Sequence, residues 1–581
     1  MNPPPALDSR NVNALWCSVL AETLARCGVI QAVVAPGSRS TPLAFAFARH
    51  PAIEAIPVLD ERSAAFFALG LSRRSRYPTV LVCTSGTAAA NFLPAVIEAQ
   101  ESGAPLLVFT ADRPPEMRAC ASGQTIDQQK LFGGHVNFYH EMAVPALGEK
   151  RLRYLRQTLV HAVERSLQGG AGPVHLNAPF RDPLPPIPDD GAAEKLAGSI
   201  DWTRFFAQLS PVSGTVPFSS SLPPLVPEVH GVIIAGPEQR AEPEGFARSV
   251  ALLALKLGWP VLADALSPLR HHAGLNPNLV TTYDLILRQP VAAERLAPDV
   301  VLCLGGWPTS KVLRRWVEEA DAPVWLVTDR PDNRDALHGR TRHLRVSPAV
   351  LAEHLAAADG ANGYQRLWAA YERKARAGVD GLLGAMTGNF EGRAAWLLAQ
   401  HLPAETPVFV ANSMPARDVE FYWPPGDRKF AFYCNRGANG IDGTLSTALG
   451  VAHGSRPAVL LTGDLALLHD TNGFLIRPKF RGSLTIVLIN NRGGGIFEHL
   501  PVSQFDPPFE EFVATPQEVD FAKLCAAYGV GYVAVNDWAH FIALVSELPA
   551  AGVRVLELRT DRKQDVKTRE RLFIEVAASL G

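Results

Sequence analysis

Short runs of Val, Ile and Leu alternate with longer amphipathic stretches along most of the 581-residue chain. Short continuous apolar runs are typical of strands buried on both faces, and the stretches between them are long enough to form covering helices. The pattern therefore predicts an α/β protein built from doubly wound parallel sheets. It occurs in three successive blocks, so we expect three such domains.

In the first block, the predicted strands end near Val34, Val58, Cys83, Phe109 and His175. Every strand except the last is followed by a polar or Gly-bearing turn and then by a helical pattern. In a parallel sheet these turns gather outside the carboxyl ends of the strands, where ligands usually bind. This edge of the first sheet is therefore a candidate binding surface.

A Pro-rich segment, Pro183–Pro188, and a segment rich in Ser and Pro, Ser210–Pro227, interrupt the pattern after the first block, as linkers do. No G-x-G-x-x-G follows the first strand of the second block, so a dinucleotide site is not supported there. The expected domains are a first domain over 1–190, a linker over 191–228, a central domain over 229–370 and a third domain over 371–581.

The strands of the second and third blocks are expected from the same apolar runs. Those of the central domain are His230–Ala235, Pro260–Ala263, Val300–Leu304 and Val324–Val327. Those of the third domain are Val408–Val410, Phe430–Tyr433, Ala458–Thr462, Leu484–Ile489 and Val553–Leu558.

Composition excludes several classes of function. The formal net charge is -2, and no basic stripe with interleaved aromatic residues occurs, so we expect no nucleic-acid partner. No uncharged apolar run reaches the roughly 18 residues of a membrane span, and the first residues lack the pattern of a secretion signal. The 7 cysteines lie far apart without a C-x-x-C pair, which favours free thiols and a reducing, cytoplasmic location.

The most informative segment runs from Gly463 to Phe497. Asp464 ends one predicted strand and Asn491 ends the next, and a right-handed crossover brings both strand ends to one edge of the sheet. A carboxylate, an amide oxygen and the backbone carbonyl of Gly493 suit a hard cation such as Mg²⁺, and the helix after Asp464 offers N–H groups to a diphosphate. The same residues also fit a helix cap followed by an ordinary turn, and spacing alone does not decide between the two.

Gly463–Asp464 combined with Asn490–Asn491 resembles the signature of thiamine diphosphate (ThDP)-dependent enzymes, with Leu465 where that signature often has Gly. The order of the three blocks is similar to the pyrimidine-binding (PYR), central and diphosphate-binding (PP) domains of that superfamily. The resemblance implies ThDP and Mg²⁺, or Mn²⁺, as cofactors. It implies metal ligation by Asp464, Asn491 and Gly493, and cofactor binding by Glu61, Ser85, Gly86, Thr87, Ile441, Gly463, Asp464, Leu465 and Asn491.

Glu61 is similar in context to the catalytic glutamate of these enzymes, which hydrogen-bonds the aminopyrimidine ring of the cofactor. A carboxyl group near apolar surface is favoured in its protonated form, which suits that role. Ile441 corresponds to the apolar wedge beneath the two cofactor rings. Considered alone, Glu61 also fits a carboxylate stabilised by a helix N-terminus, and Ile441 fits an ordinary core residue.

More specific strings resemble one subgroup, the 2-succinyl-5-enolpyruvyl-6-hydroxy-3-cyclohexene-1-carboxylate synthase (MenD) family. This family decarboxylates 2-oxoglutarate and adds the resulting succinyl carbanion equivalent to isochorismate, on the route to menaquinone or phylloquinone. The strings are PGSRSTPL (Pro36–Leu43), DER (Asp60–Arg62), TSGTAAANFLPAVIEA (Thr84–Ala99), TADRPPE (Thr110–Glu116), PTSK (Pro308–Lys311), NSMPARD (Asn412–Asp418), NRGANGIDG (Asn435–Gly443) and NNRGGGIFEHLP (Asn490–Pro501).

Both substrates implied by this resemblance are dicarboxylates, and arginine can bind a carboxylate through two parallel hydrogen bonds. Several arginines fall in the predicted strand-end turns. The loop Gly123–His135 departs from the family pattern at Gly123 and Asp127. By resemblance, the substrate-binding residues are Ser38, Arg39, Arg113, Gln124, Lys311, Ser413, Arg417, Arg436, Ile496, Phe497 and Leu500.

The resemblance also implies a homodimer or tetramer, with Glu61 and Asp464 of one active site supplied by different chains. One alternative is another ThDP-dependent enzyme, either a 2-oxoacid decarboxylase or an acetohydroxyacid synthase-like carboligase. Such enzymes act on substrates with fewer charges and do not need the arginines. A second alternative is a non-catalytic nucleotide-binding or scaffold protein that retains the fold.

Overall fold

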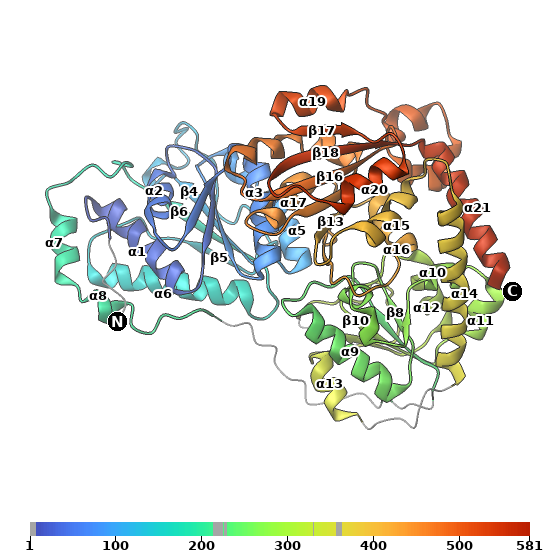
Figure 1. The fold of residues 1–581 in the computed structure, drawn as a ribbon. Helices are drawn as coiled ribbons and strands as arrows, with labels where there is room; N and C mark the ends of the chain where they lie inside the picture. The colour runs from blue at the N-terminus through green and yellow to red at the C-terminus, as the bar shows by residue number, and fades with distance from the viewer. Residues whose placement is uncertain (1–6, 213–224, 226–228, 329, 356–362, 581) are drawn as a thin grey trace. The chain divides into compact units, whose positions relative to one another are not determined.

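The computed structural model describes residues 7–212, 225, 229–328, 330–355 and 363–580 (Figure 1). Within these residues lie three six-stranded sheets, and all paired strands in them run parallel. The expected α/β class with three parallel-sheet domains is confirmed. The chain divides into two compact units, of which the first comprises Met1–Thr215, Asn435–His453 and Asp470–Phe480, and the second Val216–Cys434, Gly454–His469 and Arg481–Gly581.

The first sheet has the strand order β2-β1-β3-β4-β6-β5. Because the chain moves from β1 outward to β2 and then to β3 on the other side, the loops after β1 and β3 flank a topological switch point, where parallel sheets bind ligands. The strands are β1 (Gln31–Val34), β2 (Glu54–Pro57), β3 (Thr79–Cys83), β4 (Leu106–Asp112), β5 (Phe138–Glu141) and β6 (Pro173–Pro179).

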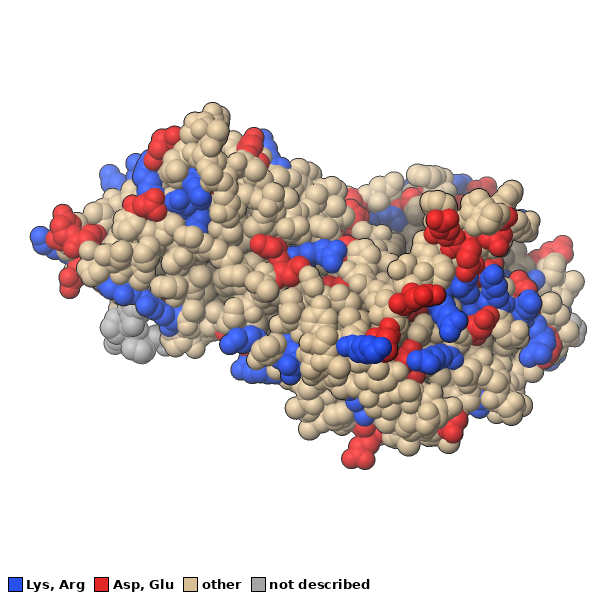
Figure 2. Space-filling view, turned by 90° about the horizontal axis from the view of Figure 1, so that it is seen from above, with Lys and Arg blue, Asp and Glu red and all other residues tan. Residues whose placement is uncertain are grey.

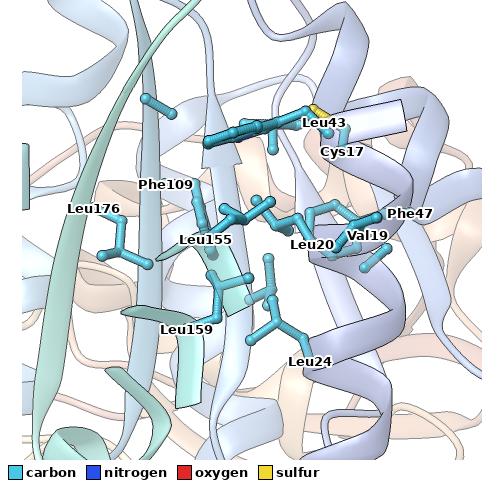
Figure 3. Close-up of a cluster of buried hydrophobic side chains, with 14 of the residues drawn as sticks. Cys17, Val19, Leu20, Leu24, Leu43, Phe47, Phe109, Leu155, Leu159 and Leu176 are labelled. Atoms are coloured by element: carbon cyan, nitrogen blue, oxygen red, sulfur yellow. The ribbon is translucent and has the colours of Figure 1, made fainter. Parts of the chain in front are cut away.

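Helices cover both faces of the first sheet. On one face, buried side chains of the sheet pack against α1 (Val12–Arg26), α2 (Thr41–Arg49) and α6 (Glu149–Leu167). The opposite face carries α3 (Glu61–Ser75), the short α4 (Thr87–Ala90) and α5 (Leu93–Ser102). Figure 3 shows part of the first core, with Cys17, Leu20 and Leu24 of α1, Leu43 and Phe47 of α2, Phe109 of β4, and Leu155 and Leu159 of α6.

The expected linker contains ordered helices. Residues of α7 (Ala192–Ser199) and α8 (Trp202–Phe205) pack into the first core, among them Ala193 and Phe205. The Pro-rich runs on either side dominate the composition of this stretch, whereas its aromatic residues provide enough apolar surface for packing. Most of Ser210–Pro227 lies outside the described residues.

The second sheet has the order β12-β11-β10-β7-β8-β9. Its strands are β7 (Gly231–Ala235), β8 (Val261–Ala263), β9 (Leu279–Val280), β10 (Val300–Leu304), β11 (Val324–Val327) and β12 (Thr341–Leu344). Its helices are α9 (Pro243–Leu257), α10 (Tyr283–Leu287), α11 (Pro290–Arg295), α12 (Lys311–Ala320) and α13 (Pro348–His354). The long helix α14 (Gly363–Ala385) contains the expected boundary between residues 370 and 371.

The third sheet has the order β14-β13-β15-β16-β18-β17, which repeats the topology of the first sheet strand for strand. Its strands are β13 (Pro407–Val410), β14 (Ala431–Tyr433), β15 (Ala458–Gly463), β16 (Ser483–Asn490), β17 (Gly531–Ala534) and β18 (Gly552–Arg559). The helices of this part of the second unit are α15 (Glu391–His401), α16 (Met414–Tyr422), α18 (Asp464–His469), α19 (Phe521–Tyr528), α20 (Trp538–Ser546) and α21 (Arg562–Leu580), with the 3₁₀ turns η5 (Gly495–His499) and η6 (Pro501–Gln504).

Within the first unit, α3 packs against α17 (Thr444–Ala452) at very short range. A Cβ atom on Gly70 of α3 would lie 2.1 Å from the carbonyl oxygen of Thr447, and one on Gly450 of α17 would lie 2.2 Å from that of Phe67. Only glycine allows two helix backbones to approach this closely. The crossing therefore fixes the position of α3, whose first residue is Glu61.

The surface carries charges of both signs. Figure 2 shows basic and acidic side chains interspersed on the face that it draws, in agreement with the net charge of -2. Among the helices of the described residues, none combines the length and the apolar character that a membrane crossing requires. All 7 cysteines are free thiols, and Cys120 alone among them is exposed.

Candidate active site

The loop after β1 carries an arginine in an unusual environment. Arg39 is 7% exposed, its Nη1 donates to the carbonyl oxygen of Phe180 at 2.8 Å, and its Nε is buried without a hydrogen-bond acceptor. Burial and the neighbouring positive charge of Arg113 both lower the pKa of Arg39. Two adjacent guanidinium groups with an unsatisfied buried donor favour an anionic ligand with several oxygen atoms. Ser38, the preceding residue, is exposed.

The loop after β3 meets the loop after β4 at the same edge. Nη1 of Arg113 donates to Oγ of the buried Ser85 at 2.8 Å, and Nε2 of Gln124 donates to the carbonyl oxygen of Ser85 at 3.0 Å. Gly86 has a φ of 91°, which favours glycine, and Thr87 begins α4. The structure therefore brings together four residues that the sequence predicts for cofactor and substrate, namely Ser85, Gly86, Arg113 and Gln124.

Gln128 supports this loop cluster, although the sequence did not single it out. It is 1% exposed; its Oε1 accepts the N–H of Gly86 at 2.8 Å, and its Nε2 donates to the carbonyl oxygen of Ala111 and to Oδ1 of Asn177. Asn177 in turn donates to Asp112 and Glu141. A polar network through Gln128 and Asn177 thus joins the loops after β3 and β4.

Glu61 is the first residue of α3, directly after the N-cap residue Asp60, whose carboxylate accepts the N–H of Ser63 at 3.0 Å. Asn472 donates to the second oxygen of Asp60 at 2.8 Å. Glu61 itself is half-buried, and its negative charge adds to burial in raising the pKa of Cys83 at the end of β3. The carboxyl group of Glu61 therefore lies near the switch point of the first sheet.

Residues 435–442 also belong to the first unit and carry Arg436 and Ile441, both half-buried. The buried carboxylate of Glu98 holds this segment, because it accepts the N–H groups of Gly437 at 2.9 Å and Ala438 at 2.6 Å. A cavity of about 260 Å³ lies between the segment and α5. Burial raises the pKa of Glu98, and the two N–H groups oppose that effect.

The second unit contains the candidate cation ligands. Asp464 follows β15 and is 4% exposed, and its Oδ2 accepts the N–H of Gly493 at 2.9 Å. Burial raises the pKa of Asp464 to about 6, although the backbone N–H groups of Gly493 and Leu465 lower it. Asn491 follows β16 and is 7% exposed, with its Nδ2 donating to Oε2 of Glu391 at 3.1 Å.

These residues fit a hard cation. Oδ1 of Asn491 is buried and has no hydrogen-bond partner among the described residues, a situation that is costly unless a ligand satisfies the atom. Asp464 adds a carboxylate and Gly493 a backbone carbonyl, so all three donors are oxygen atoms, as Mg²⁺ and Mn²⁺ prefer. A Cβ atom on Gly463 would meet no atom within 4 Å, which leaves open space beside Asp464.

The remaining predicted residues of the second unit lie in three places. Ser413 precedes α16 with a φ of 72°, and Nη1 of Arg417 donates to its carbonyl oxygen at 2.8 Å. In η5, Ile496 and Phe497 are half-buried, and Leu500 just after it is exposed. Lys311 is exposed at the start of α12. A larger cavity of about 930 Å³ beside α11, α12 and α21 contains none of the predicted site residues.

Two further residues lie behind Asn491 and were not expected from the sequence, since Glu391 contacts Asn491 and Arg569 contacts Glu391. Glu391 at the start of α15 is 3% exposed, and its second oxygen accepts Nη2 of Arg569 at 2.7 Å. Arg569 of α21 also donates to Asp418 at 2.6 Å and contacts Nε2 of His499 at 2.7 Å. These contacts join α15, α16, η5 and α21 around the candidate cation site.

Comparison with known proteins identifies related chains over nearly the whole length. Family models of the N-terminal TPP binding domain, the middle domain and the C-terminal TPP binding domain of thiamine pyrophosphate enzymes match residues 17–131, 223–410 and 419–557. The chain is 54% identical over 562 residues to a 2-succinyl-5-enolpyruvyl-6-hydroxy-3-cyclohexene-1-carboxylate synthase of Microcystis aeruginosa, which covers 96% of this chain and 98% of that protein. Proteins of the same name from Gloeothece citriformis and Synechococcus elongatus are 53% and 52% identical, over 97% and 98% of this chain and 98% and 97% of theirs.

Proposed function

Because this chain belongs to the 2-succinyl-5-enolpyruvyl-6-hydroxy-3-cyclohexene-1-carboxylate synthase family of thiamine diphosphate enzymes, we propose that it decarboxylates 2-oxoglutarate and adds the remaining four-carbon unit to isochorismate. The observation that carries this proposal is the similarity over nearly the full length to proteins of that name. The free thiols fit a cytoplasmic enzyme.

The cofactor would be held by the residues at the carboxyl ends of β15 and β16. Asp464, Oδ1 of Asn491 and the carbonyl oxygen of Gly493 would bind Mg²⁺ or Mn²⁺, and Gly463 and Leu465 would adjoin the diphosphate. When bound, ThDP supplies a nucleophilic carbon and an electron sink for the decarboxylation of a 2-oxo acid. Ser85, Gly86 and Thr87 would contact the cofactor from the first sheet, and Ile441 would support its rings.

Glu61 would exchange a proton with the aminopyrimidine ring. Its position at the first turn of α3, fixed by the cap at Asp60 and by the glycine crossing of α3 with α17, holds the carboxyl group at a constant place. A general acid that is pre-positioned in this way contributes about 10²- to 10⁴-fold to a rate.

The arginines would bind the carboxylates of the substrates. Arg39 and Arg113 supply adjacent positive charges, and the buried Nε of Arg39 would gain an acceptor when a carboxylate binds. Arg417 and Arg436 would add charge from the other strand-end loops, and Lys311 from the central domain. Ser38, Gln124 and Ser413 would donate hydrogen bonds, and Ile496, Phe497 and Leu500 would form an apolar wall.

The test combines purified protein with ThDP, Mg²⁺ and 2-oxoglutarate, with and without isochorismate, and identifies the product by mass. We expect isochorismate to be consumed and the succinylated adduct to form. Decarboxylation of 2-oxoglutarate without loss of isochorismate would overturn the substrate assignment and favour a 2-oxoacid decarboxylase.

We also propose a homodimer in which each active site uses Glu61 of one chain and Asp464 of the other. These residues belong to different compact units of the chain. Co-expression of Glu61→Gln and Asp464→Ala chains tests the idea, because a mixed dimer then has one site with both residues intact. With random pairing, roughly one quarter of the parental activity should return. Activity no higher than that of either variant alone would contradict the shared site.

A further inference from the structure

The amide group of Asn491 has two ends of similar size but opposite chemistry. Oδ1 can bind a cation, whereas Nδ2 carries two hydrogen atoms and repels a cation. The role of Asn491 in the cation site of the proposed function therefore requires one particular orientation of this amide. Nothing in the side chain of asparagine itself selects that orientation.

Glu391 selects it. An ionised carboxylate can only accept hydrogen bonds, so the end of the amide that lies 3.1 Å from Oε2 of Glu391 must be Nδ2. The opposite end, Oδ1, is then the buried atom without a partner. Gly495 leaves room for this arrangement, because a Cβ atom there would lie 2.6 Å from Nδ2 of Asn491.

Arg569 holds Glu391 in the orientation that this selection needs. The guanidinium group of Arg569 remains charged, and its Nη2 donates to Oε1 of Glu391 at 2.7 Å. Oε2 of Glu391 is then left to accept from Asn491. Arg569 is itself held by Asp418 at 2.6 Å and lies against the ring of Phe390, with 5.4 Å between Cζ and the ring centre. Both Glu391 and Arg569 are almost fully buried, so water does not compete for these contacts.

We propose that Glu391, held by Arg569, is a positioning residue that fixes the amide of Asn491 with Oδ1 toward the bound cation. This inference rests on the cation site of the proposed function. Glu391 touches neither cofactor nor substrate in this scheme, and acts only through Asn491. Hydrogen-bond partners behind a metal ligand commonly change metal affinity by about 10- to 100-fold when they are replaced.

The decisive variant is Glu391→Gln, which preserves size and shape. Arg569 can only donate, so it retains the oxygen of the new side chain, and the new amide nitrogen then faces Asn491. Asn491 must turn over to accept from that nitrogen, which directs Nδ2 toward the cation. We expect the affinity for Mn²⁺, measured by titration calorimetry in the presence of ThDP, to fall by about 10- to 100-fold.

The neighbouring residue offers a matched control. Glu557 is a buried carboxylate that accepts Nδ2 of Asn490 at 2.6 Å, and Asn490 is not among the predicted cation ligands. Glu557→Gln should therefore leave the Mn²⁺ affinity within about twofold of the parent. An equal loss in both variants would show that any change in buried charge disturbs the loop, and would overturn the proposal.

A double variant separates positioning from a purely structural role. In Glu391→Gln combined with Asn491→Asp, the new amide nitrogen donates to one oxygen of the new carboxylate, and the other oxygen faces the cation. We expect this double variant to regain Mn²⁺ affinity relative to Glu391→Gln. If Glu391→Gln does not fold, the double variant still decides, because a folded double variant that does not bind Mn²⁺ contradicts the proposal.

The outcomes also distinguish this inference from the proposed function. If the parental protein binds Mn²⁺ and ThDP and the Glu391→Gln variant binds Mn²⁺ equally tightly, the role of Glu391 is overturned and the enzyme assignment remains intact. Parental protein that binds neither Mn²⁺ nor ThDP overturns the cation site and the positioning role together.

Discussion

Gly493 cannot be replaced without disturbing the candidate cation site. Its φ of 124° lies in a region that L side chains rarely adopt, and a Cβ atom there would lie 2.5 Å from the carbonyl oxygen of Ala514. That oxygen accepts the N–H of Gly494 at 2.7 Å, so it cannot move aside freely. The N–H of Gly493 also donates to Asp464, which connects the two sides of the site.

The magnitude follows from these contacts. Holding alanine at such a φ costs roughly 1–3 kcal/mol, and weakening the hydrogen bond between Gly494 and Ala514 adds about 1 kcal/mol. The free protein can relax the loop, but cation binding requires the original geometry, so the cost of about 2–4 kcal/mol falls on binding. We therefore expect Gly493→Ala to weaken Mn²⁺ binding in the presence of ThDP by roughly 30- to 700-fold.

Titration calorimetry of Gly493→Ala with Mn²⁺ and ThDP measures this loss directly. Gly552→Ala is the matched control, since Gly552 has a φ of 93° but a Cβ atom there would meet nothing within 4 Å. The control should lose thermal stability and keep its Mn²⁺ affinity. An affinity of Gly493→Ala within threefold of the parent would refute the argument, because the loop would then tolerate the side chain without losing its geometry.

Three other changes test the site and the fold. Glu61→Gln should lower turnover by at least about 100-fold with an unchanged melting temperature, since it removes only an ionisable group; normal turnover would remove Glu61 from the mechanism. Arg39→Lys should lower kcat/KM for the substrates by about 10- to 100-fold and leave the ThDP affinity unchanged, because lysine lacks the guanidinium fork. An equal loss of kcat/KM and of ThDP affinity would indicate a folding defect and would contradict a role in substrate binding alone. Burial lowers the pKa of His175 and of His271 to about 3, whereas a histidine in an unfolded chain has a pKa of roughly 6.5. The unfolded state therefore takes up protons first, and the free energy of unfolding falls as pH decreases from about 6.5 toward 3. At pH 5 each histidine should have lowered the free energy of unfolding by about 2 kcal/mol. A melting temperature that stays constant between pH 7.5 and 5 would contradict this.

All interior strands of the described sheets could be predicted from the sequence, whereas only two of their six edge strands, β2 and β14, were expected. The strands β5, β9, β12 and β17 were not expected, and each of them lies at the edge of its sheet. Their residues are largely half-buried or exposed, so they lack the continuous apolar run of a strand covered on both faces. The apolar pattern therefore finds every interior strand, and it finds an edge strand only where the chain keeps an apolar run, as in Ile53–Val58 and Phe430–Tyr433.

Some residues of the candidate site could be predicted from the sequence, and others could not. Asp464 and Asn491 could be found because each follows a strand, and a crossover brings consecutive parallel strands to one edge. Glu391 and Arg569 could not, since they meet across 178 positions of sequence and Asn491 lies 100 positions from Glu391. No spacing rule links such residues, and neither follows a strand end where a ligand would be sought.

The crossing of α3 with α17 makes the first unit discontinuous along the chain. Arg74, near the end of α3, donates to the carbonyl oxygen of His453 across 379 positions of sequence, and Glu98 reaches Gly437 across 339. Contacts with such long loops form slowly, because the loop-closure entropy must be overcome before any of them stabilises the fold. A nascent chain that has emerged only to the end of β6 therefore exposes the glycine face of α3 and must wait for the second half of synthesis to cover it. For this reason we expect the Glu61 side of the candidate active site to complete its packing late in folding, although its residues are translated early.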